Sequence, residues 1–522
     1  MPSSLRSARG SSRSRRRLLG ALATVTVAAL LLTGCVSWFR APTSASSTSK
    51  PTGEKVDADL EPYYSQVLKW SSCSSGFQCT EVTAPMNWKD PSQATIKLAL
   101  IRKPATGTRL GSLLVNPGGP GASGYDFVRD SLNYAVDATL RANYDIVGFD
   151  PRGVGHSTAI DCGGATVLDH FNYDIIPGTP GSDSWIADAE QENAEFGQDC
   201  LDHTGALLQY VDTNSAARDL DLLRAVLGDK KLNYLGYSYG TLLGATYAEL
   251  YPKKTGRLVL DGALDPATTD FTVTDIQAKG FESAMRAWLK SCIGSTDCPF
   301  TGTVDGAMTQ IGQLLDQLQA SPLTNSDGRQ LGANTMFVAI ILPLYNKDNW
   351  PYLNKLFDEV RAGETTTAFL LADSYNDRNQ DGSYASNSTE AFVAINCLDY
   401  VSDSSIATMR SEAAQLDKDA PIFGPRMAWG GTSCAKWPFA ATRVRGPITA
   451  AGSSDILVVG TTNDPATPYV WAQNLAKELQ HGHLITYHGE GHTAYNKSNS
   501  CVNNAVDDYF VKGTVPAKDP MC

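Results

Sequence analysis

The chain has 522 residues, a length that allows two or three domains, and its 55 aspartates and glutamates outnumber its 43 lysines and arginines. The formal net charge is −12. Because nucleic acids attract basic surfaces, this balance argues against a nucleic-acid partner.

Residues 1–34 have the pattern of an export signal. Six arginines lie between Arg6 and Arg17, an apolar stretch of about fifteen residues follows, and a lipobox-like tetrapeptide ends at Cys35. The apolar stretch is short for a membrane span, which favours a cleaved signal. The mature chain would then begin at Cys35, with lipid on its sulfur and on its new amino group. The arginine cluster also approximates a twin-arginine signal, so the export route stays open.

Residues 35–61 are predicted to tether the lipid to a folded domain, because 41–53 is rich in Ser, Thr and Pro. Removal of the signal takes away six arginines and no acidic residue, so the net charge becomes −18. That charge argues against electrostatic binding to anionic lipid, and the acyl chains at Cys35 would hold the protein instead. We expect it at the extracytoplasmic face of the cell membrane, or partly secreted.

Eleven cysteines occur in the chain, and lipidation of Cys35 leaves ten. An even number in an exported protein indicates disulfides. The spacing does not determine connectivity, but neighbours along the chain suggest the pairs Cys73–Cys79, Cys162–Cys200, Cys292–Cys298, Cys397–Cys434 and Cys501–Cys522. No Cys-x-x-Cys or clustered histidine spacing supports a metal site, and none is predicted.

Strand-like runs alternate with helical ones after the tether. The strand-like runs are 113–115, 146–149, 232–235, 257–261, 455–460 and 484–487. Residues 213–227 have apolar side chains at helical spacing, and 241–250 is a second helical run rich in small residues. This alternation predicts one α/β core with a mostly parallel sheet.

The core strands stop near residue 265 and resume near 455. We therefore predict a core formed by 62–265 and 453–522, interrupted by an inserted cap at 266–452 that shapes a substrate pocket. Within the cap, 377–382 matches the first half of a calcium loop, but Ser388 stands where that loop needs a bidentate glutamate. We interpret it as a polar loop.

A Gly-x-Ser-x-Gly pentapeptide at 236–240 joins the strand-like run 232–235 to the helical run 241–250. In that context the turn exposes the hydroxyl of Ser238, and the two glycines let the chain pass close to its neighbours. Such a pentapeptide also recurs by chance, so the motif alone does not establish a nucleophile.

A serine nucleophile needs a base and a carboxylate that orients the base. Asp464 follows the strand-like run 455–460, and His492 lies in a glycine-flanked loop after 484–487. The order Ser, Asp, His places the three groups at one edge of a parallel sheet. The alternative for Asp464 is a turn or helix cap, and His488 is the rival base.

Two further motifs follow early strands. The glycine-rich loop 116–124 lets backbone N–H groups approach a developing oxyanion. Its letters also match Gly-x-Gly-x-x-Gly, but export removes the protein from dinucleotides and no P-loop lysine follows, so we predict no nucleotide cofactor. Asp150 and Arg152, after 146–149, are expected to organise loops beneath the site.

These motifs resemble those of the α/β-hydrolase serine peptidases related to prolyl iminopeptidase. More narrowly, the chain resembles the actinobacterial secreted tripeptidyl aminopeptidases and the allied mycobacterial cell-envelope serine proteases, over nearly all residues after Pro62. The segments that carry the resemblance are 116–124, 150–157, 236–240, 464–468 and 489–492. Prolyl iminopeptidases usually have a histidine where this chain has Asn116, a departure that favours the tripeptidyl branch.

The resemblance implies an α/β-hydrolase fold with Ser238 as nucleophile, Asp464 and His492 as its partners, and no cofactor. It also implies that the Gly119 and Tyr239 backbone amides form the oxyanion hole. It places a carboxylate for the substrate's α-ammonium in the cap. Asp399 is our candidate, although it could instead cap a helix, and Glu390 is an alternative.

We thus expect an exported, lipid-anchored serine hydrolase, an aminopeptidase that releases short peptides from the N-termini of peptides or proteins, and the resemblance implies that these are tripeptides. A carboxylesterase acting on envelope or small esters is the first alternative, because the same catalytic groups cleave esters and amides. A catalytically silent surface-binding lipoprotein on the same scaffold is the second.

Overall fold

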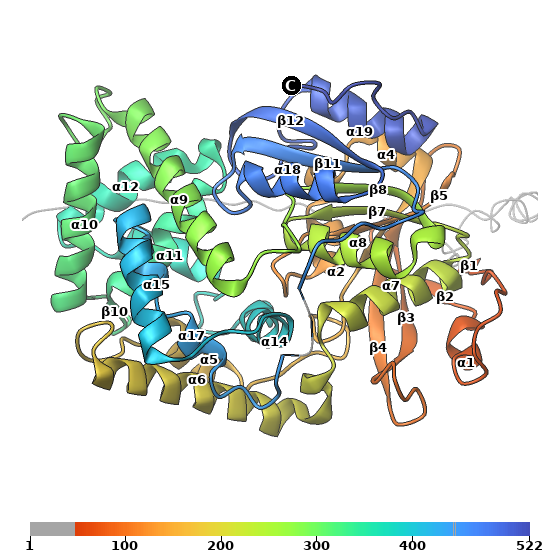
Figure 1. Cartoon of the computed structure of the whole chain (residues 1–522), viewed down its shortest axis with the longest axis horizontal. Helices are drawn as coiled ribbons and strands as arrows, with labels where there is room; N and C mark the ends of the chain where they lie inside the picture. The colour runs from red at the N-terminus through yellow and green to blue at the C-terminus, as the bar shows by residue number, and fades with distance from the viewer. Residues whose placement is uncertain (1–46, 442, 444) are drawn as a thin grey trace, which may run out of the picture. The chain divides into compact units, whose positions relative to one another are not determined.

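In the computed structural model, which describes residues 47–441, 443 and 445–522, ten strands of these residues form one sheet (Figure 1). Its order is β1-β2-β3-β4-β6-β5-β7-β8-β11-β12. The strands are β1 (Ser47–Thr48), β2 (Lys69–Ser74), β3 (Phe77–Pro85), β4 (Thr95–Lys103), β5 (Gly111–Asn116), β6 (Tyr144–Phe149), β7 (Leu232–Tyr237), β8 (Thr255–Asp261), β11 (Ile456–Asn463) and β12 (Gly482–Glu490). From β6 to β12 neighbouring strands are parallel, and β1 to β4 are antiparallel. The predicted fold class is confirmed.

Helices cover both faces of the sheet, which is why its central strands are buried along almost all of their length. One hydrophobic core lies against α1 (Glu61–Tyr64), α7 (Thr213–Leu227), α8 (Tyr239–Leu250) and α18 (Tyr469–Glu478). The core on the opposite face lies against α2 (Gly124–Asp130), α3 (Leu132–Ala135), α4 (Ala138–Asn143) and α19 (Ser500–Lys512).

The segment between β8 and β11 is mainly helical (Figure 1). Its buried apolar side chains form a further hydrophobic core. Its elements are α9 (Asp270–Cys292), α10 (Val304–Ala320), β9 (Leu323–Thr324), β10 (Gln330–Leu331), α11 (Ala333–Leu344), α12 (Trp350–Arg361), α13 (Thr366–Tyr375), α14 (Ser388–Asp399), α15 (Ile406–Asp419), α16 (Gly424–Met427) and α17 (Gly431–Cys434). Two earlier helices, α5 (Ala165–Tyr173) and α6 (Asp183–Thr204), contact α11 and α17. The division at residues 266 and 452 stays a prediction.

The residues from 47 to 61, expected to be part of a tether, lie against the core. Ser47 and Thr48 pair with β2, and the Thr52 N–H donates to the Ala225 carbonyl at 3.0 Å. Glu54 forms ion pairs with Arg224 at 2.5 Å and Lys254 at 3.1 Å. The tether prediction is therefore wrong for this stretch, because its backbone pairs with the core and Glu54 meets two distant cations, contacts that a composition rich in Ser, Thr and Pro does not reveal.

Five disulfides join the chain neighbours that the sequence suggested, and this prediction is confirmed. They are Cys73–Cys79, Cys162–Cys200, Cys292–Cys298, Cys397–Cys434 and Cys501–Cys522. The predicted signal and Cys35 lie outside the described residues. Within the described part of the chain, no helix combines the length and apolar character needed to cross a membrane.

The outer side of β12 is paired by residues near position 520. The Thr486 N–H donates to the Pro520 carbonyl at 2.9 Å, and the Cys522 N–H donates to the Thr486 carbonyl at 2.7 Å. The Cys501–Cys522 disulfide ties this segment to α19. Residues 520–522 therefore pair with β12 and cover part of its outer edge.

Candidate active site

Ser238 occupies a tight turn between β7 and α8. Its backbone has φ 54° and ψ −125°, a conformation that a non-glycine residue adopts only when its surroundings enforce it. The Ser238 N–H donates to the Asp261 carbonyl at 3.0 Å. A Cβ at Gly236 would lie 2.4 Å from the Gly240 carbonyl oxygen, so the turn closes only without a side chain there. The structure thus has the sharp strand-to-helix turn that the pentapeptide predicts.

Asp464 and His492 are in direct contact. His492 Nδ1 lies 3.0 Å from each carboxylate oxygen of Asp464. The carboxylate, 2% exposed, also accepts the backbone N–H groups of Ala466, Thr467 and Thr493 at 2.9, 2.8 and 3.2 Å. A carboxylate held this way keeps the imidazole proton on Nδ1 and leaves Nε2 free to act as a base.

Thr467 is a member of this group that the sequence reasoning did not single out. Its Oγ1 donates to Asp464 Oδ2 at 2.9 Å and lies 3.2 Å from His492 Nδ1. An aspartate side chain in a loop often accepts the backbone N–H groups two and three residues later, so the place of Thr467 three residues after Asp464 was an available signal.

Ser238 and His492 line the same cavity of about 700 Å³. No hydrogen bond joins their side chains among the described residues, and catalytic contacts of this kind can tighten when substrate binds. His488, the rival base, lies exposed on β12 and does not line the cavity. The structure therefore brings together the predicted serine, aspartate and histidine.

The glycine-rich loop lies against the turn that carries Ser238. A Cβ at Gly118 would stand 2.8 Å from Ser238 Cβ and 3.1 Å from the Tyr239 nitrogen. Asn116 Oδ1 accepts the Gly118 N–H at 3.0 Å and so holds the loop in place. Tyr239 begins α8, where the first N–H groups have no partner within the helix, and Gly119 lines the cavity. The oxyanion-hole assignment of Gly119 and Tyr239 stays a prediction, compatible with this arrangement.

Asp150 and Arg152 support the loops beneath the site, as expected. Asp150 accepts the Ser123 hydroxyl at 2.6 Å and the Tyr125 N–H at 2.9 Å. Arg152 is fully buried and makes two 2.7 Å hydrogen bonds to Asp219. Burial is tolerable for this guanidinium because its charge is paired.

The prediction that Asp399 binds the substrate amine is wrong. The side chain is 1% exposed and does not line the cavity. Its Oδ1 accepts the Thr213 N–H at 3.0 Å, its Oδ2 accepts the Thr213 hydroxyl, and Arg443 lies 3.6 Å away. Burial raises the pKa of Asp399. The carboxylate satisfies a free N–H at the start of α7, which is the helix-capping role left open by the sequence.

Asp377 is the carboxylate that the structure places at the cavity. It is the one acidic side chain among the cavity-lining residues that the structure describes. Its Oδ2 accepts hydroxyls from Ser386 at 2.5 Å and Ser388 at 3.1 Å, whereas Oδ1 accepts none from the described residues. Asp377 has φ 56°, so the chain turns sharply here.

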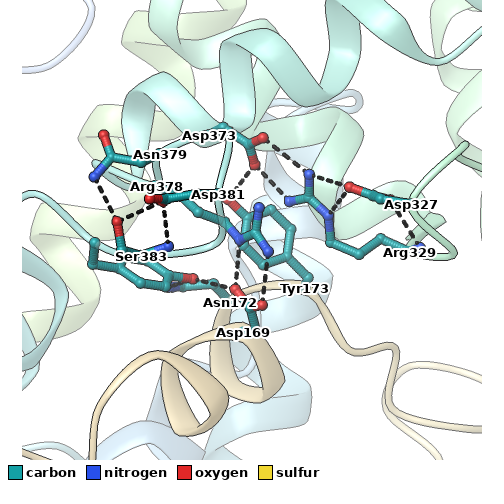
Figure 2. A network of polar contacts seen from close by, with 11 residues as sticks. Asp169, Asn172, Tyr173, Asp327, Arg329, Asp373, Arg378, Asn379, Asp381 and Ser383 are labelled. Atoms are coloured by element: carbon teal, nitrogen blue, oxygen red, sulfur yellow. Dashed lines mark hydrogen bonds and ion pairs between the residues drawn. The ribbon is translucent and has the colours of Figure 1, made fainter.

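A polar network fixes the loop that follows Asp377 (Figure 2). Arg378 forms two hydrogen bonds to Asp169 of α5, at 2.6 and 2.8 Å, and Arg329 forms two to Asp373 at 2.6 and 2.9 Å. In the same loop Asp381 Oδ1 accepts the backbone N–H of Ser383 at 3.0 Å. Arg378 and Asp381 of the calcium-like segment are thus engaged with protein groups, and its interpretation as a polar loop stays a prediction.

The rest of the cavity wall is mixed. Apolar side chains come from α5, α9, α11, α14 and α16 and include Phe171, Phe281, Ile341, Val393 and Met427. Amides from α5, α6, α9 and α14 contribute hydrogen-bonding groups, namely Asn172, Asn193, Gln277 and Asn396. Such a wall can bind both apolar side chains and peptide groups.

Comparison with known proteins shows that the chain is similar to named hydrolases. A family model described as "TAP-like protein" matches residues 420–522. Serine protease Hip1 of Mycobacterium tuberculosis is 34% identical over 532 residues, covering 97% of this chain and 98% of that protein. Carboxylesterase B of the same species is 36% identical over 498 residues, covering 92% and 94%. Tripeptidyl aminopeptidase of Streptomyces lividans is 31% identical over 471 residues, covering 87% and 86%.

Proposed function

This chain belongs to the α/β-hydrolase serine peptidases, and from that membership we propose that it is an exported, lipid-anchored aminopeptidase that releases tripeptides from N-termini. Ser238 would attack the scissile carbonyl while His492 Nε2 takes its proton, and Asp464 would hold the imidazolium. The amides of Gly119 and Tyr239 would stabilise the oxyanion. His492 then returns the proton to the departing amine, and water hydrolyses the acyl-enzyme by the same steps.

One observation carries the proposal: the cavity that contains Ser238 and His492 also contains a single carboxylate among its described lining residues, Asp377. An aminopeptidase must bind a charged α-ammonium, and a cation removed from water needs a charged partner. The free Oδ1 of Asp377 supplies an acceptor, while two serine hydroxyls hold Oδ2. Asp377 therefore takes the role that the sequence had suggested for Asp399.

N-acetylation tests this role directly. Acetylating a good tripeptide substrate should lower kcat/KM at least about tenfold, because the carboxylate loses its cationic partner. Asp377→Asn should lower cleavage of free-amino peptides far more than hydrolysis of a small neutral ester. Asp381→Asn is the matched control, since Asp381 is on the same loop but does not line the cavity. Equal cleavage of acetylated and free peptides would contradict the aminopeptidase proposal.

The apolar part of the cavity wall favours one alternative, a carboxylesterase acting on envelope or small esters. Phe281, Ile341 and Met427 would accommodate an acyl chain without any need for an ammonium site. A fluorogenic panel of free-amino mono-, di- and tripeptides and short acyl esters separates the two activities. Esters turned over with much higher kcat/KM than any peptide would favour the esterase.

A catalytically silent surface-binding lipoprotein is the remaining alternative. Fluorophosphonate labelling decides it, because only an activated serine reacts quickly with this probe. We expect the native chain to be labelled and Ser238→Ala to remain unlabelled with an unchanged melting temperature. An unlabelled native chain would support the silent protein.

The proposal also includes a lipid anchor at Cys35. Cys35→Ala should release the protein from membranes into the soluble fraction with its activity retained, because the catalytic groups all lie after residue 116. Detergent partitioning and activity of each fraction measure this. A variant that stays membrane-bound would show that the preceding apolar stretch is a retained span.

A further inference from the structure

The inserted segment touches the histidine of the catalytic group directly. The backbone N–H of His492 donates to the carbonyl of Tyr345 at 2.7 Å. Tyr345 follows the last residue of α11, and carbonyls at a helix end have no partner within the helix. The histidine loop, from the sheet, therefore satisfies a group that belongs to the helical segment.

The Tyr345 side chain makes a second contact with His492. The two rings are 5.4 Å apart between centroids and meet at 79°, an edge-to-face arrangement that aromatic rings favour. Tyr345 also lines the cavity that contains Ser238. Its ring is thus a wall of the substrate cavity and a support of the imidazole at the same time.

Gly491 makes this approach sterically feasible. Its φ is +101°, and a Cβ there would stand 3.0 Å from the Tyr345 carbonyl oxygen. A side chain immediately before His492 would therefore push the histidine loop away from the end of α11. This gives the glycine of the 489–492 motif a physical reason.

Tyr345 is itself held by aromatic neighbours in the inserted segment. Its ring lies 5.9 Å from that of Phe281 on α9, and Phe281 stacks on Phe423 at 5.7 Å. Burial also raises the pKa of Tyr345, so its hydroxyl stays neutral. The position of the ring next to His492 is therefore set by packing within the inserted segment.

We propose that Tyr345 is a positioning residue for His492, and that the inserted segment is by this contact part of the catalytic machinery, not only a wall of the substrate cavity. The inference rests on the proposed function of Ser238 and His492. Asp464 holds Nδ1 of the imidazole. The Tyr345 carbonyl restrains the backbone of His492, and the Tyr345 ring packs against one side of the imidazole. Without the Tyr345 ring, the His492 side chain can rotate about its bonds, and its Nε2 spends less time aligned with Ser238.

The test compares Tyr345→Leu and Tyr345→Met, which remove the ring, with Tyr345→Phe, which keeps it. Substrates are a free-amino tripeptide amide and a small neutral ester that needs only the catalytic groups. Loss of the ring should lower kcat for both substrates by about tenfold or more, with the KM for the ester unchanged, because misplacement of a catalytic group by about 1 Å costs up to about 10²-fold. Tyr345→Phe should restore most of the wild-type kcat.

Phe357→Leu is the matched control. It removes an aromatic ring from the core of the same inserted segment, at a side chain that packs on Trp288 and Phe300 and does not line the cavity. Its kcat should match the wild type. Melting temperatures show whether Tyr345→Leu and Tyr345→Met are folded. The kcat of a folded variant is then compared with that of the wild type and of Phe357→Leu.

Two outcomes separate this inference from the proposed function. If the ring-less variants raise only the KM for the tripeptide and leave ester kcat unchanged, Tyr345 is a cavity wall alone and the inference is overturned. If wild-type Ser238 neither reacts with a fluorophosphonate nor turns over either substrate, the proposed function itself fails.

Discussion

The imidazole of His492 lies 3.0 Å from both carboxylate oxygens of Asp464, although the two residues are 28 positions apart in the chain. Asp464 follows β11 and His492 follows β12, and these strands are parallel neighbours. Their ends therefore lie side by side, which brings the two loops together. The same carboxylate accepts three backbone N–H groups, so its position is fixed independently of the histidine.

Asp464→Asn should lower kcat by about 10⁴-fold while the fold survives, as when other serine triads lose this charge. The asparagine carbonyl can still accept the Ala466 and Thr467 N–H groups. Its amide nitrogen, however, favours the wrong imidazole tautomer. Steady-state kinetics and melting temperature measure both effects. A loss of less than about tenfold would show that Asp464 does not orient the base.

His492→Ala should lower kcat on the order of 10⁶-fold, because Ser238 loses its base. His488→Ala should change it little, since His488 is exposed on β12 and does not line the cavity. Both variants can be assayed on the same tripeptide substrate. If the change at His488 is the crippling one, the base has been misassigned.

Thr467→Val should lower kcat by about 10 to 100-fold, because it removes a hydrogen bond to a charged group at nearly constant shape. The hydroxyl donates to Asp464 Oδ2 at 2.9 Å, beside His492 Nδ1. Thr467→Ser, which keeps the hydroxyl, is the control and should retain most activity. Equal losses in the two variants would point to packing of the methyl group instead.

Glu390→Gln should make stability less dependent on pH. Glu390 is 4% exposed and accepts the Cys162 N–H at 3.2 Å, and its burial raises its pKa from 4.5 to about 7. A carboxyl whose pKa rises on folding contributes stability below its unfolded pKa and loses it as the pH rises through the folded value. The loss therefore falls between about pH 4.5 and pH 7.

In the Glu390→Gln variant a neutral amide replaces the carboxyl, so this loss disappears. The free energy of unfolding of the variant relative to wild type should increase from pH 5 to pH 8, by at most about 3 kcal/mol. Urea unfolding at the two pH values measures it. A difference independent of pH would contradict the expected protonation of Glu390.

The sequence was informative where a function depends on a short motif. The turn around Ser238 needs its glycines at fixed spacing, and Asp464 and His492 each follow a strand-like run directly. Because the carboxyl ends of parallel strands share one edge of the sheet, the residues could be placed together without knowledge of the packing. The disulfide pairs could likewise be predicted, because each joins two cysteines that follow one another along the chain.

Contacts between distant segments could not be predicted in this way. Asp399 meets Thr213 across 186 positions, and its burial there depends on how α14 packs against α7. Glu54 meets Arg224 across 170 positions, which orders a stretch that composition assigned to the tether. Tyr345 reaches His492 by the same kind of long-range packing. Local patterns carry no information about such partners.

The pairing of residues 520–522 with the outer edge of β12 has a consequence for solubility. An uncovered strand at a sheet edge is a template on which another copy of the chain can add a strand. Here the N–H and carbonyl of Thr486 are occupied by Pro520 and Cys522, and the bond from Cys522 to Cys501 keeps that cover in place. Reduction of this disulfide would free the cover and expose β12 to edge-to-edge aggregation, while the catalytic groups remain untouched.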